Sequence, residues 1–434
     1  MKPKIIVLDD DPTGSQTVHS CLLLTRWDVA TLKTALADAA PLFFVLTNTR
    51  GMEATRAAVV TREVCENLKA ALADYSGPVL FVSRSDSTLR GHYPVETDVM
   101  NEVLGPFDAT LLTPGFFEGG RVTRDSTHYL MVDDRPVPTH ETEFARDSVF
   151  GYTTAFLPDY VAEKTGGRIM ARDVARLTLA GLRTGEAGAW LGGLRENAIG
   201  VVDGETPDDY RLFADAVLNA AAQGKRLLFR SAASLLTALA KLPPQPVAAE
   251  AFATLVRDGR PGVVIVGSHV AKTTAQLGVL LQQPGIVGLP LDVSRLPGAR
   301  TQLAAELAQS VAHAHAQGLT PVVYTSRSEL KFASIAERLA FGEAVSGTLM
   351  DVVQRLPTTI GFLISKGGIT SNDVLSTGLA LTASRVLGQI LPGVTVVQTP
   401  LDHRLSSVPV VIFPGNVGGD DALARAYRRL RPAP

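Results

Sequence analysis

Short apolar runs rich in β-branched residues alternate along this chain with longer segments rich in alanine and leucine. In the first half of the chain, six such runs predict β-strands, at residues 5–8, 42–46, 79–82, 109–112, 199–202 and 226–229. Buried parallel strands have this continuous apolar character, and the segments between them are long enough for crossover helices. The alternation therefore predicts an α/β protein in which helices flank mostly parallel sheets.

The length of the chain and one proline-rich stretch predict two domains. A single hydrophobic core rarely serves 434 residues, and Pro243, Pro244 and Pro246 favour extended backbone over helix. Beyond these prolines, helices are predicted, one of them near residues 373–390, between strands at residues 262–266, 286–291, 321–325, 360–364, 394–397 and 408–413. We therefore expect two α/β domains, residues 1–240 and 250–434, each a mostly parallel sheet flanked by helices, with a cleft between them.

Charge and apolar length limit the partners of the chain. There are 41 Lys and Arg against 43 Asp and Glu, without a basic tail, so neither nucleic acid nor a membrane surface is an expected partner. No apolar run reaches the roughly 18 residues of a membrane helix, and acidic residues follow the first strand too soon for a signal peptide. The two cysteines, Cys21 and Cys65, suit a reducing compartment. We expect a cytoplasmic protein that binds a small molecule; its oligomeric state stays open.

Polar residues gather directly after the predicted strands of the first domain. Residues 9–14 (DDDPTG) follow the first strand, and residues 83–92 (SRSDSTLRGH) follow the third. Because the carboxyl ends of parallel strands lie along one sheet edge, we expect these segments to form one site, with residues 119–150 as a long excursion over it. Two arginines beside carboxylates and hydroxyls suit a small polyhydroxylated anion. Ordinary loop chemistry, or magnesium at the acidic residues 9–11, are the alternatives.

Three glycine-containing turns follow strands of the second domain, at residues 267–269, 367–371 and 415–420. Glycine allows backbone N–H groups to approach a phosphate closely. Neither a complete P-loop nor a G-x-G-x-x-G motif occurs, which disfavours a dehydrogenase with a dinucleotide-binding fold. Each turn alone is explained by helix capping, but three turns on one edge, with Lys366 and Ser268, predict phosphate binding.

These motifs resemble the four-carbon acid sugar kinase family over nearly the whole chain. Residues 9–14 are similar to the D-D-x-T-G opening of that family, and residues 84–91 to its K/R-x-D-S-T-L-R-G signature. Residues 142–147 resemble the segment that closes the acid-sugar site, and the glycine turns resemble the nucleotide-contacting turns. The chain departs from the family at Ile369, where many relatives have glutamate, and at Pro414 and Val417.

The resemblance implies a kinase that uses ATP and Mg²⁺ to phosphorylate the terminal hydroxyl of an acid such as threonate, erythronate or 3-oxo-tetronate. The N-terminal domain would bind the acid and the C-terminal domain the nucleotide, and no residue is assigned to a protein-bound metal. Arg84 or Arg90 is the expected carboxylate clamp, because a guanidinium pairs with a carboxylate in a bidentate manner. The implied site residues are catalytic Asp10 and Asp86; substrate-binding Asp9, Thr13, Arg84, Ser87, Thr88 and Arg90; and nucleotide-binding Ser268, Lys366, Gly367, Gly368, Ile369, Thr370, Gly415 and Asn416.

Two alternative functions, from other classes of protein, stay open. The altered turn at Ile369 is also compatible with a ligand-binding or regulatory module that has a degenerate nucleotide site. A dehydrogenase of small hydroxy acids is disfavoured by the missing dinucleotide motif. If the chain is a kinase, the sequence does not show which acid it phosphorylates. It does not distinguish stereoisomers, an oxo from a hydroxy substituent, or a sugar acid from a hydroxy amino acid such as 4-hydroxythreonine.

Overall fold

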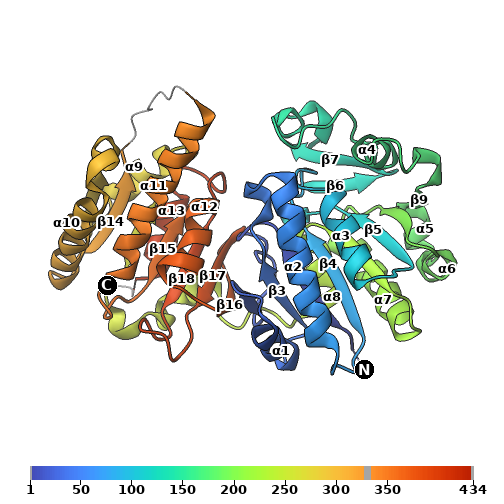
Figure 1. Ribbon diagram of the computed structural model, residues 1–434, viewed down its shortest axis with the longest axis horizontal. Helices are drawn as coiled ribbons and strands as arrows, with labels where there is room; N and C mark the ends of the chain where they lie inside the picture. The colour runs from blue at the N-terminus through green and yellow to red at the C-terminus, as the bar shows by residue number, and fades with distance from the viewer. Residues whose placement is uncertain (1, 327–333, 432–434) are drawn as a thin grey trace. The chain divides into compact units, whose positions relative to one another are not determined.

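A computed structural model describes residues 2–326 and 334–431 and divides into two compact units, Met1–Pro243 and Pro244–Pro434. In each unit, helices flank a sheet (Figure 1). Among the described residues, no helix combines the length and the apolar character that crossing a bilayer requires. The α/β class and the mostly parallel sheets predicted from the sequence are confirmed.

The sheet of the first unit is wholly parallel. Its strand order is β2-β3-β1-β4-β11-β5-β10-β9. All six predicted strands are present, whereas β2 and β9, of three residues each, were too short to predict. The strands are β1 Lys4–Asp9, β2 Leu22–Leu24, β3 Leu42–Leu46, β4 Val79–Arg84, β5 Ala109–Thr113, β9 Ala175–Leu177, β10 Ala198–Val202 and β11 Leu227–Ser231.

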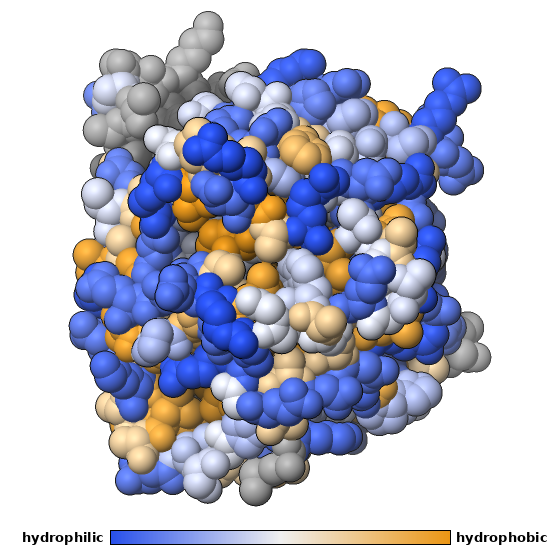
Figure 2. Space-filling model, turned by 90° about the vertical axis from the view of Figure 1, so that its right-hand side faces the viewer, coloured by the Kyte–Doolittle hydropathy of each residue, from blue (hydrophilic) through white to orange (hydrophobic). Residues whose placement is uncertain are grey.

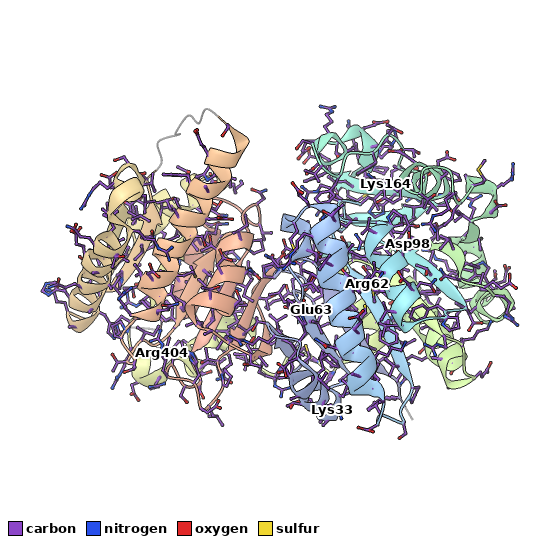
Figure 3. All side chains as sticks on the ribbon, viewed as in Figure 1. Lys33, Arg62, Glu63, Asp98, Lys164 and Arg404 are labelled. Carbon is purple, nitrogen blue, oxygen red and sulfur yellow. The ribbon has the colours of Figure 1, made fainter. Side chains whose placement is uncertain are left out.

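Helices with one apolar face cover this sheet. In α2, for example, Val60, Val64 and Leu68 recur at helical spacing and are buried, while Lys33, Glu63 and Asp98 lie on the outer sides of α1, α2 and α3 (Figure 3). On the face that Figure 2 presents, hydrophilic side chains surround small separate apolar areas. The helices are α1 Val29–Ala37, α2 Ala54–Leu72, α3 Val95–Leu104, α4 Leu157–Lys164, α5 Leu179–Arg183, α6 Ala187–Gly193, α7 Pro207–Ala222 and α8 Ala233–Ala240.

The predicted excursion at residues 119–150 contains a second, small sheet. Strands β6 (Arg121–Arg124), β7 (Thr127–Val132) and β8 (Arg135–Pro138) form an antiparallel meander, seen above β4 in Figure 1. His128 on β7 bonds through Nε2 to the carbonyl oxygen of Ser87 at 2.7 Å. This bond fixes the meander against the loop that follows β4.

The second unit has five parallel strands and an antiparallel edge. Its strand order is β13-β14-β12-β15-β18-β17-β16, in which the pairs β18–β17 and β17–β16 are antiparallel. The elements are β12 Val263–Val266, α9 Ala271–Leu281, β13 Ile286–Leu291, α10 Leu296–Ala316, β14 Thr320–Thr325, α11 Ile335–Gln354, β15 Leu363–Lys366, α12 Gly368–Asp373, β16 Ala383–Leu391, β17 Val394–Gln398, β18 Pro409–Phe413 and α13 Ala422–Arg429.

The prediction of a helix near residues 373–390 is wrong. Only one short helical segment occupies its start, and β16 occupies its second half. The alternate residues Ser384, Val386 and Ile390 are buried, which is the period of a strand. The alanine and leucine content of this segment suggests helix, but pairing with β17 satisfies its backbone as a strand. The strand predicted at residues 360–364 begins three residues later, at Leu363.

Candidate active site

Two polar loops of the first unit begin side by side at the carboxyl edge of its sheet. β1 and β4 are adjacent parallel strands, and their last residues, Asp9 and Arg84, are paired in the register. β11 lies on the other side of β4, with Ser231 paired to Arg84. The acid loop (residues 10–14, after β1) and the signature loop (residues 85–92, after β4) therefore share one edge, as parallel strands require.

Asp10 in the acid loop is held by donors from two other strand ends. Arg50, in the loop after β3, donates to the Asp10 carboxylate through Nη2 and, at 3.2 Å, through Nε. The Ser85 hydroxyl donates to Asp10 Oδ2 at 2.6 Å, and Arg50 Nη1 lies 3.4 Å from Asp11 Oδ2. Arg50 is absent from the predicted site residues, and its only sequence signal was its place in a polar loop after a predicted strand.

Asp9 and Arg84 lie inside the protein, beneath the site. Their side chains are 0% and 4% exposed, and Arg84 Nη1 is 3.7 Å from Asp9 Oδ1. Burial raises the pKa of Asp9 to about 8. A Cβ on Gly14 would lie 2.0 Å from the Asp9 carboxylate, so glycine is required in the acid loop. The two residues were predicted to contact substrate, whereas the structure places them in support of the loops.

Asp86, Thr88 and Arg90 form a compact cluster on the signature loop. Arg90 Nε donates to Asp86 Oδ2 at 2.7 Å, and the Thr88 hydroxyl donates to the same oxygen. Arg90 also lies 3.7 Å from Asp147 Oδ2 and 4.9 Å from the centre of the Phe144 ring. Asp86 and Arg90 stay partly exposed, at 15% and 29%, so both can reach a ligand.

The charges around Asp86 keep it ionised. Burial acts to raise the pKa of this carboxyl, but the guanidinium groups of Arg50 and Arg90 and the Thr88 hydroxyl outweigh it and lower the pKa to about 2. The carboxylate therefore accepts hydrogen bonds throughout the physiological pH range. A group with so low a pKa is a weak proton acceptor.

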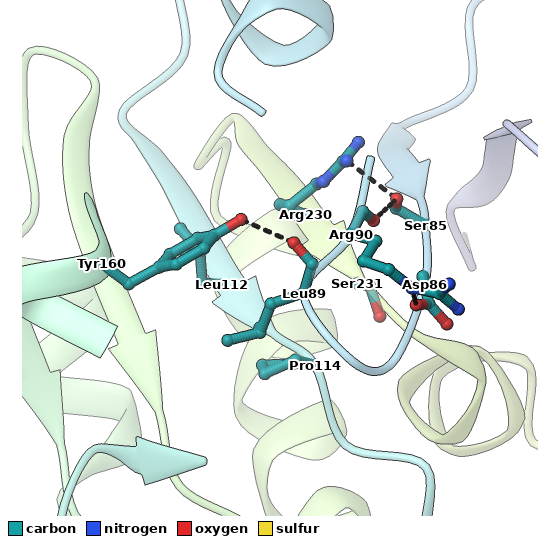
Figure 4. A pocket seen from close by; sticks show the side chains of 9 residues that line it. All are labelled: Ser85, Asp86, Leu89, Arg90, Leu112, Pro114, Tyr160, Arg230 and Ser231. Atoms are coloured by element: carbon teal, nitrogen blue, oxygen red, sulfur yellow. Dashed lines mark hydrogen bonds and ion pairs between the residues drawn. The ribbon is translucent and has the colours of Figure 1, made fainter. Parts of the chain in front are cut away.

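Two residues of the signature loop have positive φ angles. Leu89 has φ 66° and Gly91 has φ 125°. A Cβ on Gly91 would lie 2.3 Å from Ser85 Oγ and 2.6 Å from Arg230 Nη2, so only glycine fits. The Tyr160 hydroxyl donates to the Leu89 carbonyl at 2.9 Å and holds the unusual conformation (Figure 4).

Arg230 on β11 supports the signature loop from below. Its guanidinium donates to Ser83 Oγ at 2.7 Å, to Ser85 Oγ at 2.8 Å and to Glu96 Oε2 at 2.6 Å. Arg230 and Tyr160 line a cavity of about 20 Å³ (Figure 4), room for about one water molecule. This cavity is therefore too small for an organic acid. A charged residue within a buried strand was the signal that could have identified Arg230.

The other predicted residues of this edge shape the loops. The Thr13 N–H donates to Asp11 Oδ1 at 2.8 Å and closes a turn in the acid loop. Ser87 is buried, and its carbonyl accepts the bond from His128. These contacts order the two loops.

The glycine turns of the second unit lie together. β12, β15 and β18 are adjacent parallel strands, so the turns after them share one edge. A Cβ on Gly267 would lie 2.2 Å from Thr370 Oγ1, and one on Gly367 would lie 3.0 Å from the Cβ of Ser268. The Thr273 hydroxyl donates to the Gly415 carbonyl at 3.2 Å. This edge therefore consists mainly of closely packed backbone and hydroxyl groups (the glycine edge).

Lys366 holds the glycine edge from inside the unit. Its side chain is buried, lies 4.3 Å from the centre of the Phe413 ring, and donates through Nζ to the Gly415 carbonyl at 3.0 Å. Burial lowers the pKa of this ammonium to about 7. The predicted phosphate-binding lysine thus faces a backbone turn. Ile369 and Asn416 are exposed, and Gly368 begins α12.

Within the described residues, no three His, Cys, Asp or Glu side chains gather in a group that could hold a metal ion. The acid-loop carboxylates instead face Arg50 and Arg84. A divalent cation would therefore need ligands from a bound substrate in addition to the protein.

Comparison with known proteins identifies both halves of the chain. Residues 5–239 match a sugar-binding N-terminal domain, and residues 263–423 match a nucleotide-binding C-terminal domain. The chain is 27% identical to D-threonate kinase from Bordetella bronchiseptica, covering 99% of this chain and 98% of that protein. It is 31% identical to D-erythronate kinase from Heliobacterium modesticaldum, covering 37% of this chain and 36% of the relative.

Solved structures share the fold. A Salmonella typhimurium LT2 protein described as a tRNA synthase has a TM-score of 0.71 at 20% identity, with all of both chains covered. A Haemophilus influenzae protein has a TM-score of 0.64 at 18% identity, covering 98% of this chain and 100% of that chain. At such identities the likeness establishes the architecture alone.

Proposed function

Because this chain belongs to the four-carbon acid sugar kinase family, a family of small-molecule kinases, we propose that it transfers the γ-phosphoryl group of ATP to the terminal hydroxyl of a four-carbon acid sugar. Threonate, erythronate and 3-oxo-tetronate are the candidate acids, the first two being the substrates named for its relatives. The observation that carries the proposal is the cluster of Asp86, Thr88 and Arg90, in which Asp86 and Arg90 are partly exposed and Thr88 is buried.

The first unit supplies the acid-binding half of the proposed site. Asp86 is an ionised acceptor for substrate hydroxyls, and Arg90 presents the rest of its guanidinium to an oxyanion. The Arg90 contact concerns substrate oxygens in general and does not assign the carboxylate. Because Asp86 accepts a proton only weakly, its proposed part is to orient the attacking hydroxyl. Phosphoryl transfer depends chiefly on such positioning and on charge stabilisation.

The second unit supplies the nucleotide-binding half. Backbone N–H groups at Gly368 and Gly415 would cradle the phosphates, with Ser268 beside them, while the Gly367 N–H donates to the Phe413 carbonyl at 2.8 Å and fixes the turn. Lys366 holds the carbonyl of Gly415 and thereby shapes this cradle. Mg²⁺ would arrive with ATP, bound mainly by phosphate oxygens, and would neutralise charge on the transferred group.

In the transfer step, the substrate hydroxyl oxygen forms a bond to the γ-phosphorus as the bond to the β–γ bridging oxygen breaks. ADP leaves with the electron pair of that bond. The hydroxyl proton passes to a nearby carboxylate or to water. In-line attack requires the acid and the nucleotide to be brought together during the reaction, with water excluded so that ATP is not hydrolysed.

A substrate panel tests the proposal. The purified chain is incubated with ATP, Mg²⁺ and each of D-threonate, L-threonate, D-erythronate, 3-oxo-tetronate and 4-hydroxythreonine, and both ADP release and product mass are measured. Acid-dependent ADP release with a phosphorylated product is the expected result. Thermal stabilisation by an acid without ADP release would instead assign the chain to ligand-binding modules.

A further inference from the structure

Most guanidinium groups around Asp86 already have carboxylate partners. In each pair, the negative carboxylate offsets the positive charge of the guanidinium, so these arginines add little net positive charge for an anionic ligand. Arg50 faces Asp10 and Asp11, Arg90 faces Asp86 and Asp147, and Arg230 faces Glu96, whereas Arg84 is buried, with only 4% of its side chain exposed.

Arg121 on β6 differs from these arginines. In the described part of the chain, no carboxylate lies within ion-pair distance of its guanidinium. Nη1 donates to the Gly119 carbonyl, while the buried Nε has no hydrogen-bond partner among the described residues. The guanidinium lies 5.9 Å from the centre of the Phe116 ring, which holds the side chain in place. Arg121 is therefore an anchored cation with an unused Nε–Nη2 edge.

The meander places this cation beside the signature loop. Thr123 and His128 are paired across β6 and β7, with Thr123 Oγ1 and His128 Nδ1 2.9 Å apart, and His128 continues to Ser87 of the signature loop. Arg121 precedes Thr123 by two residues, so its side chain leaves β6 on the same face. The charges of Asp86 and Arg90 both act on the pKa of Arg121, as expected for close neighbours.

We propose that Arg121 binds the carboxylate of the acid substrate through its Nε–H and Nη2–H groups. A carboxylate fits two parallel donors on one edge of a guanidinium, and it satisfies the buried Nε that the protein leaves unpaired. Arg121 then contributes the net positive charge that the paired arginines lack, while Asp86 and Arg90 contact the hydroxylated remainder of the molecule. This assignment rests on the proposed function and adds to it the residue that selects acids.

The test compares Arg121→Gln with Arg124→Gln. Arg124 lies on the same strand, is more exposed and pairs with Glu205, so its substitution controls for the loss of a positive charge from β6. Steady-state kinetics and calorimetric binding are measured with D-threonate and D-erythronate. For Arg121→Gln, we expect the KM and Kd for the acid to rise roughly 10- to 150-fold, with kcat at saturating acid and KM for ATP retained. Arg124→Gln should match the wild type.

Arg121→Lys keeps the positive charge but removes the two-donor edge of the guanidinium. It should fold as the wild type does and show a smaller rise in the KM for the acid.

Each other outcome has a definite meaning. Acid affinity that is unchanged in both Arg121 variants, in a protein that phosphorylates the acid, overturns this inference and leaves the proposed function standing. A rise in KM for ATP alone would assign Arg121 to a phosphate and also overturn it. A wild-type protein that neither binds nor phosphorylates any acid overturns the proposed function and this inference together.

Discussion

The two candidate binding edges recognise their ligands by different physical means. At the edge of the first unit, charged side chains such as Arg50, Asp86 and Arg90 are fixed by ion pairs and short hydrogen bonds. At the glycine edge, backbone groups and hydroxyls dominate, and Lys366 points into the protein. An acid sugar that differs from others by stereocentres needs side chains at fixed positions, whereas phosphates need only close backbone donors. The contrast predicts that substrate specificity resides in the first unit.

The two edges also bury charge differently. Asp9 and Asp86 are both carboxyls near the end of a strand, yet burial raises the pKa of Asp9 to about 8 while arginines lower that of Asp86 to about 2. At Asp9 burial outweighs the pairing with Arg84, whereas at Asp86 two arginines and a hydroxyl outweigh burial, so only Asp86 stays ionised at neutral pH. At the glycine edge, Lys366 has no carboxylate partner within residues 2–326 and 334–431, and its burial lowers its pKa to about 7.

The substitution Asp86→Asn tests the charged edge of the first unit most directly. It keeps the shape of the side chain but removes the ionised acceptor that orients the hydroxyl, so kcat for the acid should fall roughly 100- to 1,000-fold while KM for ATP is retained. Because the pKa of Asp86 is lowered to about 2, its ionisation produces no loss of wild-type activity between pH 7 and pH 5. Steady-state kinetics over this pH range check both statements; wild-type turnover by the variant would give Asp86 a structural role only.

Removing the Arg90 guanidinium should have the next largest effect. In Arg90→Ala, one charged contact to the substrate is lost. The loss of transition-state stabilisation, calculated from the ratio of kcat/KM values for the acid, should be about 2–4 kcal/mol. Nucleotide affinity, measured by ADP binding, should be unchanged. If Arg90→Ala weakens acid and nucleotide equally, the division of labour between the two edges is wrong.

The substitution Gly415→Ala probes the glycine edge. Its Cβ would meet only Ser268 Oγ, at an ordinary contact distance of 3.9 Å, so the fold should tolerate it. A phosphate packed on this turn would not, and KM for ATP should rise about tenfold, equivalent to about 1.4 kcal/mol, with little change in KM for the acid. Gly278→Ala in α9, where a Cβ meets nothing within 4 Å, is the matched control. Unchanged ATP kinetics would remove Gly415 from the nucleotide site.

The smallest expected effect concerns stability. Lys366 has a pKa of about 7 in the native state against an ordinary lysine value of 10.5, so between these pH values the unfolded chain binds more protons and native stability rises with pH. In Lys366→Met this slope, at most about 1.4 kcal/mol per pH unit, should disappear.

Urea unfolding at pH 7.5 and pH 9.5 measures the change. The difference in unfolding free energy between wild type and Lys366→Met should shift by about 1–2 kcal/mol between these pH values. Lys69→Met, at an exposed lysine of α2, should show no such shift. Identical shifts in both variants would mean that the Lys366 ammonium stays charged in the native protein.

The alternation of apolar runs predicted the parallel sheets because burial on both faces leaves a continuous apolar signal. The local pattern gave a wrong prediction at β16, because its alanine and leucine content is typical of a helix whereas pairing with β17 makes it a strand. It also missed β6, β7 and β8, because strands in a small, partly exposed meander carry no buried run.

The sequence by itself determined which loops carry polar residues, since strand ends in a parallel sheet are predictable from local pattern. Only the tertiary structure decided where each side chain lies: Arg84 turns inward to Asp9, Arg50 and Arg230 enter from other strand ends, and Arg121 has no carboxylate within ion-pair distance among the residues that the structure describes. Ion pairing and burial depend on residues that are far apart in the chain. Local pattern therefore cannot assign them, whereas packing does.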